Sequence, residues 1–329
     1  MNPYNKIIKP KISIILPVYN GAIHIIDTIN SILNQTMTEF ELIIINDASK
    51  DNSKEIILSF IDSRIIYIEN QKNLGQIASL NKGIQLSKTD LIARIDQDDV
   101  FLKEKLKIQY EYIKNNKDIS VVGTWAAIID KDNKIQRYMS SPIHHNRMVN
   151  TLLNSNPLFH PSVLIRKNII FEMGMYSPQY KYTEDYNLWC GLVLSGHKIA
   201  NIPEYLLHYR VHDNQSSQNN NSTQLENALK VRNIFFKEII NDLTKLDKII
   251  LNGFNSNELS DIAYTCSDIS AQRAEFLNSR IYLCLSIKHN KFNLKSYLML
   301  LLLYFSSSLY QNIVVKKNIF RSKLVDHDE

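Results

Sequence analysis

The stretch from Leu91 to Asp99 reads Leu-Ile-Ala-Arg-Ile-Asp-Gln-Asp-Asp, an apolar run that ends in carboxylates. At the end of a buried strand, Asp96, Asp98 and Asp99 would repel one another and be costly to desolvate. A divalent cation removes this conflict, because Mg²⁺ or Mn²⁺ is bound by one or two protein carboxylates and shares its other positions with substrate phosphates. Asp-x-Asp alone is a weak signal, since a solvated acidic turn has the same pattern. The rest of the sequence must distinguish a metal site from such a turn.

The segments before this stretch alternate between strand and helix patterns. β-branched apolar runs predict strands at 11–16, 41–45, 64–68 and 91–95, and apolar residues at helical spacing predict helices at 22–33, 53–61 and 76–86. This order predicts an α/β fold with a Rossmann-like, doubly wound parallel sheet and right-handed crossovers. Such sheets bind nucleotides at the carboxyl ends of their strands, which is where the three aspartates stand.

The pattern loosens after Asp99. Residues 101–114 and 184–195 read as helices, and 121–130 with 134–138 reads as a hairpin. The polar run 214–223 indicates a boundary, so we expect one domain at 1–223 and a helical C-terminal region at 224–329.

The last predicted helix has an unusual composition. Residues 296–315 carry no charge and are flanked by Lys295 before and by Lys316, Lys317 and Arg321 after. Serines, Gln311 and Asn312 gather on one side of its second half, which favours an amphipathic helix at about 295–321 lying on an anionic membrane surface. The alternative is a packing helix of a C-terminal bundle.

Composition excludes several classes. The 329 residues are 44% hydrophobic and 22% charged, with a mild net charge of +5, as in ordinary globular chains. The lysines are dispersed, so we expect no nucleic-acid partner. No apolar leader opens the sequence, and Cys190, Cys266 and Cys284 lack metal-ligand spacing, so we expect a cytoplasmic protein with free, buried thiols.

Each predicted strand is followed by residues that suit a nucleotide. Tyr19 offers a ring to stack on a base, Asp47 can accept from an imide N–H, and Asp96 can bind a ribose. Taken singly, each has a structural reading: Tyr19 as a packing ring, Asp47 as a helix cap and Gly75 as a turn glycine. Because all of these turns lie on one edge of the predicted sheet, their joint occurrence favours a nucleoside-diphosphate site.

Six motifs in order resemble the family 2 inverting glycosyltransferases with the GT-A fold. They are Ser13–Asn20, Asn46–Asp51, Asn73–Gly75, Ala93–Asp99, Thr183–Trp189 and Tyr209–His212, and the resemblance covers roughly 11–213. It implies a nucleotide-binding sheet whose acceptor-side half is mixed. Asn46 and Ala48 depart from the commonest form of the second motif, which bears on nucleotide preference.

The resemblance also implies roles for individual residues. The nucleotide-sugar binding set is Pro17, Tyr19, Asn20, Asp47, Asn73, Gly75, Asn81, Arg94, Asp96 and Gln97. The metal set is Asp98, Asp99 and His212, with Mg²⁺ or Mn²⁺ as the cation. Within the first set, Tyr19 stacks on uracil and Asp47 accepts from it.

The acceptor side is expected around the predicted helix at 184–195. Transfer to a hydroxyl needs a base on the face opposite the leaving group, and the resemblance gives that role to Asp185. Glu184, Trp189 and His160 are expected on the same side, with Trp189 offering a surface to a sugar ring. The alternatives are that Glu184 and Asp185 only cap the helix and that His160 is an ordinary loop histidine.

Among known subgroups, the pattern most resembles bacterial lipooligosaccharide and O-antigen transferases that form β-1,3 links. This implies UDP-GlcNAc, UDP-Gal or UDP-Glc as donor, a lipid-borne glycan as acceptor, and a peripheral location on the inner face of the plasma membrane. Two other classes stay open: a nucleotidyltransferase, which would need a glycine-rich basic loop after the first strand, and a non-catalytic glycan- or lipid-binding module. No Gly-x-Gly-x-x-Gly follows a strand, which disfavours a dinucleotide enzyme.

Overall fold

The computed structural model describes residues 9–212, 221–241 and 293–305, together with single positions between 257 and 286. The chain forms two compact units, which are described separately: Met1–His145 with Asn156–Asn233, and Asn146–Ser155 with Ile234–Glu329. The division falls inside α9 (Asn221–Asn241). The functional domain boundary expected at 223/224 stays a prediction.

The first unit carries the sheet. Its strands are β1 (Ile12–Val18), β2 (Phe40–Asn46), β3 (Ile65–Glu69), β4 (Leu91–Arg94), β5 (Val100–Phe101), β6 (Ile119–Ile129), β7 (Ile135–Met139), β8 (Leu164–Arg166) and β9 (Lys198–Arg210). Its helices are α1 (Ile25–Leu33), α2 (Ser53–Leu58), α3 (Gln76–Leu86), α4 (Lys105–Asn115), α6 (Lys167–Glu172) and α7 (Glu184–Leu194), with 3-10 turns η1 (His160–Ser162) and η2 (Pro178–Tyr180).

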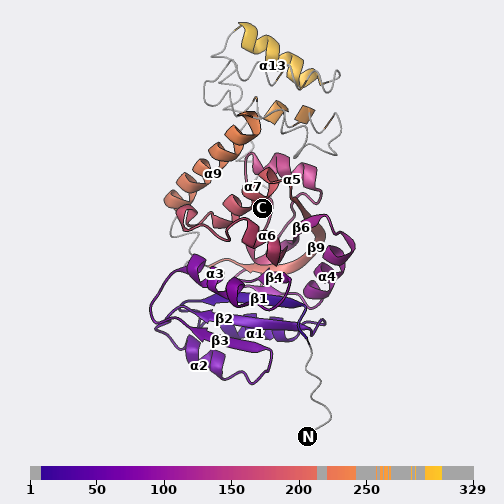
Figure 1. The fold of residues 1–329 in the computed structure, drawn as a ribbon. Coiled ribbons are helices and arrows are strands. Elements are labelled where there is room, and N and C mark those ends of the chain that lie inside the picture. The colour runs from indigo at the N-terminus through magenta and orange to yellow at the C-terminus, as the bar shows by residue number, and fades with distance from the viewer. Residues whose placement is uncertain are drawn as a thin grey trace. The chain divides into compact units, whose positions relative to one another are not determined.

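The sheet has the order β3-β2-β1-β4-β8-β6-β9-β5, and β7 pairs with β6 at its side. β3, β2, β1 and β4 run parallel, as Figure 1 shows. β8 is antiparallel to β4 and β6, whereas β6 and β9 are parallel. The sheet is therefore parallel in its first half and mixed in its second, which confirms the predicted fold class.

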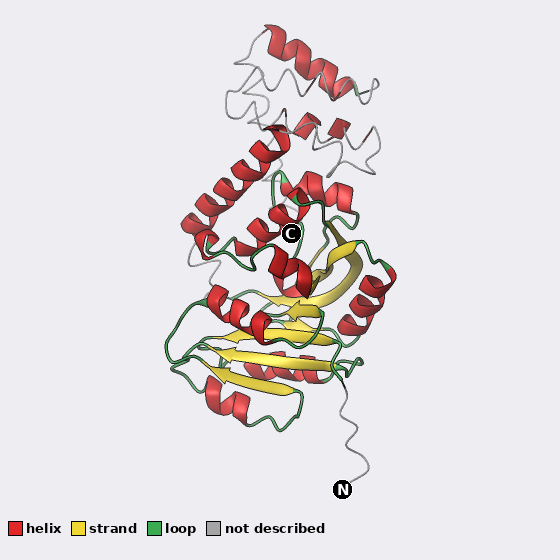
Figure 2. Cartoon of the chain, in the orientation of Figure 1, coloured by secondary structure: helices red, strands yellow, loops and turns green. Residues whose placement is uncertain are grey.

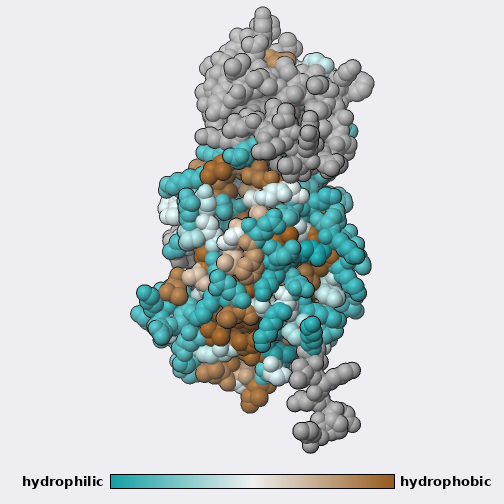
Figure 3. All heavy atoms as spheres, viewed as in Figure 1, coloured by the Kyte–Doolittle hydropathy of each residue, from teal (hydrophilic) through white to brown (hydrophobic). Residues whose placement is uncertain are grey.

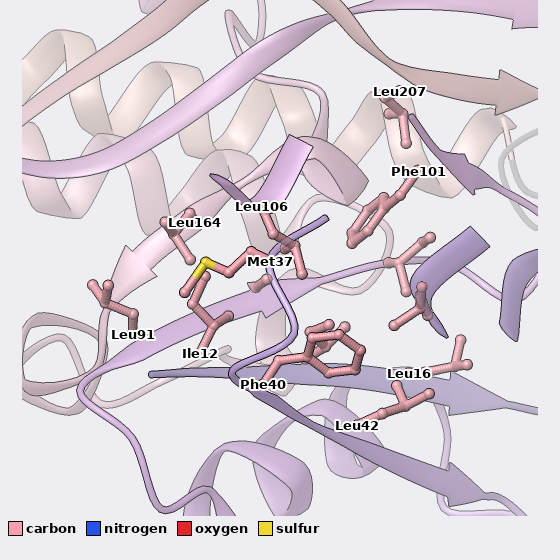
Figure 4. Packing of buried hydrophobic residues seen from close by; sticks show 14 of the residues in the cluster. Ile12, Leu16, Met37, Phe40, Leu42, Leu91, Phe101, Leu106, Leu164 and Leu207 are labelled. Carbon is pink, nitrogen blue, oxygen red and sulfur yellow. The ribbon is translucent and has the colours of Figure 1, made fainter. Parts of the chain in front are cut away.

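Both faces of the sheet are covered at β1 and β2, whose residues are mostly apolar. Every residue of β1 and β2 is buried, as expected for parallel strands between helix layers. Ile14 and Leu16 share one hydrophobic cluster with Ile29 of α1, and other members of this cluster, among them Phe40, Leu42 and Phe101, are drawn in Figure 4.

The opposite face of β1 packs against α3, and the helices beside the sheet are visible in Figure 2. Gly83 makes the approach possible, since a Cβ at this position would lie 2.5 Å from Cγ2 of Ile15. This close contact fixes the height of α3 over the sheet and thereby places the loop at its N-terminus beside the strand ends.

Three elements differ from expectation. The helix expected at 101–114 begins only at Lys105, because Val100 and Phe101 pair with β9 as a short strand. The stretch 139–212 also contains α5 (His145–Leu152) and the long strand β9, which the sequence patterns had not indicated. Cys190 is free and buried, as predicted, whereas Cys266 and Cys284 lie outside the described residues.

The described part of the second unit is helical. In α13 (Leu294–Phe305), Ser296 and Met299 are buried while Tyr297 and Leu298 are exposed. The rest of the predicted membrane-surface helix, to about residue 321, lies outside the described residues. No helix in the described part of the chain is long and apolar enough to cross a membrane.

Hydrophobic atoms also reach the surface between hydrophilic ones, as the visible face in Figure 3 shows. Ile23 and Ile61 are the most exposed of the large apolar side chains. Scattered residues of this kind are normal at a protein surface and carry no functional signal.

Candidate active site

The carboxyl ends of β1, β2, β3 and β4 lie at one edge of the sheet, because these strands are parallel neighbours. The loops that follow them carry most of the predicted nucleotide-binding residues. Hydrogen bonds between side chains and backbone join these loops in pairs, so the edge is a connected structure. Most of the predicted set from Pro17 to Asp99 is therefore brought together, with Asn81 as an exception that is described below.

Gln97 joins the first and fourth loops. Its side-chain amide accepts from the Tyr19 backbone N–H at 2.8 Å and donates to the Tyr19 carbonyl at 3.1 Å. Tyr19 is 40% exposed, and a residue whose ring stacks on a base must be exposed. Asn20 joins the first and second loops, since its backbone N–H donates to Ser49 Oγ and its side chain accepts from Lys50 N–H.

Asp47 is buried, and its carboxylate binds the third loop. Oδ1 accepts from the Asn70 side chain at 2.7 Å and from Leu74 N–H at 2.9 Å, and Oδ2 accepts from Gly75 N–H at 2.8 Å. Three of its lone pairs are thus used within the protein. A contact with uracil would rest on the remaining lone pair of Oδ2, so the base-reading role stays a prediction.

The third loop depends on Asn73 and Gly75, which were predicted, and on Asn70 and Lys82, which sequence reasoning missed. Asn70 is buried, donates to Asp47 and accepts from Lys82 Nζ at 2.6 Å. Gly75 has φ of +88° and ψ of 162°, a conformation that is essentially restricted to glycine. Asn73 is exposed and accepts from Gly75 N–H. The run of Asn70, Asn73 and Gly75 after a strand was the available signal.

Arg94 is almost fully buried and pairs with Asp96 through two of its nitrogens. Gln76 Nε2 also donates to Asp96, at 3.0 Å. Burial raises the pKa of Asp96, and the guanidinium of Arg94 opposes that rise. The predicted ribose ligand is therefore held in place from two elements, β4 and the first turn of α3.

Asp98 and His212 meet at the end of β9, with His212 Nε2 2.9 Å from Asp98 Oδ2. Asp99 is fully buried: Oδ1 accepts from Arg210 N–H, and Oδ2 has no hydrogen-bond partner among the described residues. Burial raises the pKa of Asp99 well above its usual range, and Asp98 adds to the rise.

Arg210, which we had not singled out, holds the acidic loop. Its buried guanidinium donates to the Asp98 carbonyl at 2.7 Å and to Asp130 and Asn133 in the turn before β7. β9 thereby fixes both the loop that carries the three aspartates and the position of His212, two residues further on.

The acidic loop suits a divalent cation that also binds a diphosphate. Such a cation takes only one or two protein ligands, which Asp98 and His212 can supply, and the buried Oδ2 of Asp99 is an orphaned acceptor nearby in sequence. In the described part of the chain, no three or more His, Cys, Asp or Glu side chains form a group that could hold a metal by themselves. These residues therefore fit a cation that is bound jointly by the protein and by a diphosphate, rather than one bound by protein ligands alone.

The second group of carboxylates opens α7. Glu184 is buried, and its Oε2 has no hydrogen-bond partner in the part of the chain that the structure describes. Burial, together with neighbouring Asp185, raises the pKa of Glu184 to about 7. Asp185 is partly exposed and accepts from Asn156 Nδ2 at 2.7 Å. Burial raises the pKa of Asp185 too, while Arg94 is among the groups that lower it.

One acceptor-side expectation is wrong. Trp189 is completely buried, so its ring has no face open to a sugar. The ring packs edge-on to His160, with 6.1 Å between centroids, because α7 turns this position into the core.

His160 and Asn81 meet at Tyr176. His160 Nε2 lies 2.8 Å from the Tyr176 hydroxyl, and burial lowers the pKa of His160 well below its usual range. The side-chain amide of Asn81 donates to the Tyr176 carbonyl and accepts from its N–H. Asn81 also lines a cavity of about 420 Å³ with Leu188 of α7 and the loop 173–178. In this structure Asn81 thus lies beside the acceptor-side elements and binds protein backbone.

Known proteins are similar to this chain in sequence and in fold. A profile described as glycosyl transferase family 2 matches residues 13–174. An uncharacterized glycosyltransferase of Haemophilus influenzae is 33% identical over 68% of this chain and 72% of its own length. This chain belongs to glycosyltransferase family 2.

A further relative and a solved structure are also similar to this chain. The O-antigen biosynthesis glycosyltransferase WbnJ of Escherichia coli is 34% identical to the enzyme over 63% of this chain and 82% of WbnJ. A crystal structure of S. aureus TarS in complex with UDP-GlcNAc superposes with a TM-score of 0.59 at 16% identity, covering 88% of this chain and 90% of that chain. At this identity the likeness shows the GT-A fold alone.

Proposed function

We propose that this glycosyltransferase is a metal-dependent, inverting enzyme. It moves a hexose or N-acetylhexosamine from a UDP-sugar to a hydroxyl of a lipid-borne glycan and forms a β linkage, β-1,3 by resemblance. The resemblance to WbnJ, whose name places it in O-antigen biosynthesis, supports a role in making cell-surface polysaccharide. The UDP-GlcNAc bound to TarS supports the choice of donor class.

The observation that carries the proposal is the presence of two groups of carboxylates, each containing an aspartate whose pKa is affected by the buried guanidinium of Arg94. One group is Asp96 with Asp98, and the other is Glu184 with Asp185. Burial raises the pKa of Asp96 and of Asp185, and the buried guanidinium of Arg94 opposes both rises, so its charge acts on both groups. Displacement at an anomeric carbon needs separate sites for the leaving diphosphate and for the acceptor's base.

On the donor side, the exposed ring of Tyr19 would stack on uracil, and Asp96 would accept from ribose hydroxyls. Asp98 and His212 would hold a Mg²⁺ or Mn²⁺ ion, which neutralises the charge that develops on the leaving diphosphate. The Gln97 and Arg210 bonds keep these side chains in place before a substrate arrives, which is the preorganisation that such a site requires.

On the acceptor side, Asp185 takes the proton. The acceptor oxygen attacks the anomeric carbon, a new C–O bond forms, and the bond to the diphosphate oxygen breaks with its electron pair leaving on UDP. The acceptor's proton passes to an Asp185 oxygen. A single displacement inverts the anomeric centre, so an α-linked donor yields a β product. Burial makes Asp185 a stronger base than an exposed aspartate.

We place the enzyme in the cytoplasm, on the inner face of the plasma membrane. A lipid-borne acceptor would be presented there, and the basic residues at the C-terminal end of the sequence would bind anionic headgroups. Domain 1–223 would carry the chemistry and 224–329 the membrane contact.

The direct test is a panel of UDP-sugars, assayed for UDP release by the full chain with Mg²⁺, with Mn²⁺ and with excess chelator. We expect turnover of at least one of UDP-GlcNAc, UDP-Gal and UDP-Glc, and loss of that turnover on chelation. Undiminished turnover in chelator would refute metal dependence. Binding of UDP without any turnover, in the presence of glycan acceptors as well, would favour a binding module.

A further inference from the structure

Asn156 contacts the catalytic candidate Asp185 from a separate segment of the chain. Its Nδ2 donates to Asp185 Oδ2 at 2.7 Å, across 29 positions of sequence. Its Oδ1 accepts from Leu158 N–H at 3.1 Å. The bond to Leu158 orients the side-chain amide, so that the NH₂ group is directed at the carboxylate.

The segment that carries Asn156 is itself anchored. The carbonyl of Pro157, the next residue, accepts from Ser141 Oγ at 2.6 Å and from Asn201 Nδ2 at 3.0 Å. Asn201 itself is buried in β9. Asn156 is thus fixed by the sheet, while Asp185 is fixed by the first turn of α7.

We propose that Asn156 is a positioning residue for the base of the transfer reaction. The donated hydrogen bond holds Asp185 in one rotamer and occupies Oδ2, which leaves Oδ1 for the proton of the acceptor hydroxyl. This inference rests on the proposed function, because it has meaning only where Asp185 takes a proton. Proton abstraction is efficient when the base is held in position by a further group, which here would be Asn156.

The bond also affects ionisation. Burial raises the pKa of Asp185, and this rise is opposed by the Tyr186 backbone N–H, by Arg94 and by the Asn156 amide. The titratable groups that act on Asp185 or respond to it are Glu184 and Cys190 on α7, Arg94 on β4 and Tyr176 on the loop before α7. A hydrogen bond donated to a carboxylate favours its charged form, so Asn156 helps to keep the base ionised.

Two variants separate positioning from loop stability. Asn156→Asp keeps the size of the side chain and the acceptor for Leu158 N–H, but it replaces the donor with a second carboxylate. Asn156→Ala removes both bonds. Asn154→Ala, at an exposed position of the same segment, is the matched control. Circular dichroism and thermal melting show whether each variant folds. If one of the two Asn156 variants does not fold, the other is used for the test.

The assay is UDP release from UDP-GlcNAc, or from the best donor of the panel, as a function of pH, with UDP affinity measured in parallel. We expect kcat to fall roughly tenfold to a hundredfold in both variants, as for the loss of other orienting contacts, with unchanged UDP affinity. A base acts only when ionised, so kcat rises with pH through its pKa. Removing the donor raises that pKa and moves the acidic limb of the profile to higher pH.

Two results would overturn the inference: wild-type kcat with an unmoved acidic limb in Asn156→Asp, or a loss that appears only in KM. Failure of the proposed function gives a different result. In that case Asp185→Asn itself would turn over as fast as the wild type, whatever the Asn156 variants do.

Discussion

Replacing Glu184 by glutamine should stabilise the protein at neutral and alkaline pH. Glu184 is 6% exposed, and its pKa is raised from 4.5 to about 7 by burial and by Asp185. An acid whose pKa is raised by folding costs nothing while it stays protonated, below its unfolded pKa. The cost of ionising it in the folded state grows as the pH rises from 4.5 to about 7 and is fully present above that.

The size of this cost follows from the two pKa values. A change of one in pKa corresponds to about 1.4 kcal/mol, so a rise from 4.5 to about 7 corresponds to about 3 kcal/mol of lost stability at alkaline pH. At pH 5, where Glu184 is mostly protonated in the folded state, the same relation gives a loss of stability of only about 1 kcal/mol. The glutamine variant is neutral at both pH values and should gain about 2 kcal/mol more at pH 8 than at pH 5.

Thermal and urea unfolding of both proteins at these two pH values would measure the gain. At about 2–4 °C per kcal/mol, the variant should melt several degrees above the wild type at pH 8 and close to it at pH 5. Glu204→Gln, at an exposed position of β9, should not change the pH dependence. An equal difference between Glu184→Gln and wild type at both pH values would refute the argument.

Three further changes test other parts of the account. Ala48 has φ of +58°, a conformation that costs an L-residue about 1–2 kcal/mol. Ala48→Gly removes this strain but adds conformational entropy to the unfolded chain, so the free energy of unfolding should rise by up to about 1 kcal/mol. A lower melting temperature in the variant would contradict this. Gln97→Glu sets a carboxylate oxygen against the Tyr19 carbonyl and should weaken UDP binding by roughly tenfold, as measured by calorimetry with UDP. Unchanged affinity would show that the bonds between Gln97 and Tyr19 do not position the Tyr19 ring for UDP. Asp98→Ala should weaken UDP binding in Mn²⁺ but not in chelator, and an equal effect in both would refute cation binding by Asp98.

The parallel half of the sheet could be predicted because its signal is local. Strands covered on both faces read as unbroken apolar runs, and 41–45 was expected where β2 spans Phe40–Asn46. The strand ends, and with them the loops that carry Tyr19, Asp47 and Asp96, followed from topology. Fine differences arose only at the borders of elements.

The second half depends on long-range pairing. β9 exposes Pro203 and Glu204 in its middle, which hides the strand pattern, and it forms because β6 and β5 pair with it on either side. Arg210 was missed for the same reason, since its partners Asp98, Asp130 and Asn133 lie far away in sequence. Spacing along one segment carries no information about such contacts.

Side-chain roles were the least predictable part of the site. A tryptophan one turn after Asp185 could point outward or inward, and the rotation of α7 buries it. Asp47 was expected to read a base, yet its neighbours in space are the amide groups of the third loop. Asn156 had no assigned contact, because its bond to Asp185 exists only in the folded chain.

The central claim is that Asp185 removes the acceptor's proton, and Asp185→Asn tests it most directly. Asparagine keeps the size of the side chain but cannot act as a base. If Asp185 is the base, kcat for transfer should fall by about 10² to 10⁴, while UDP-sugar affinity stays near that of the wild type and the melting temperature does not fall. A variant that transfers sugar as fast as the wild type would contradict this claim.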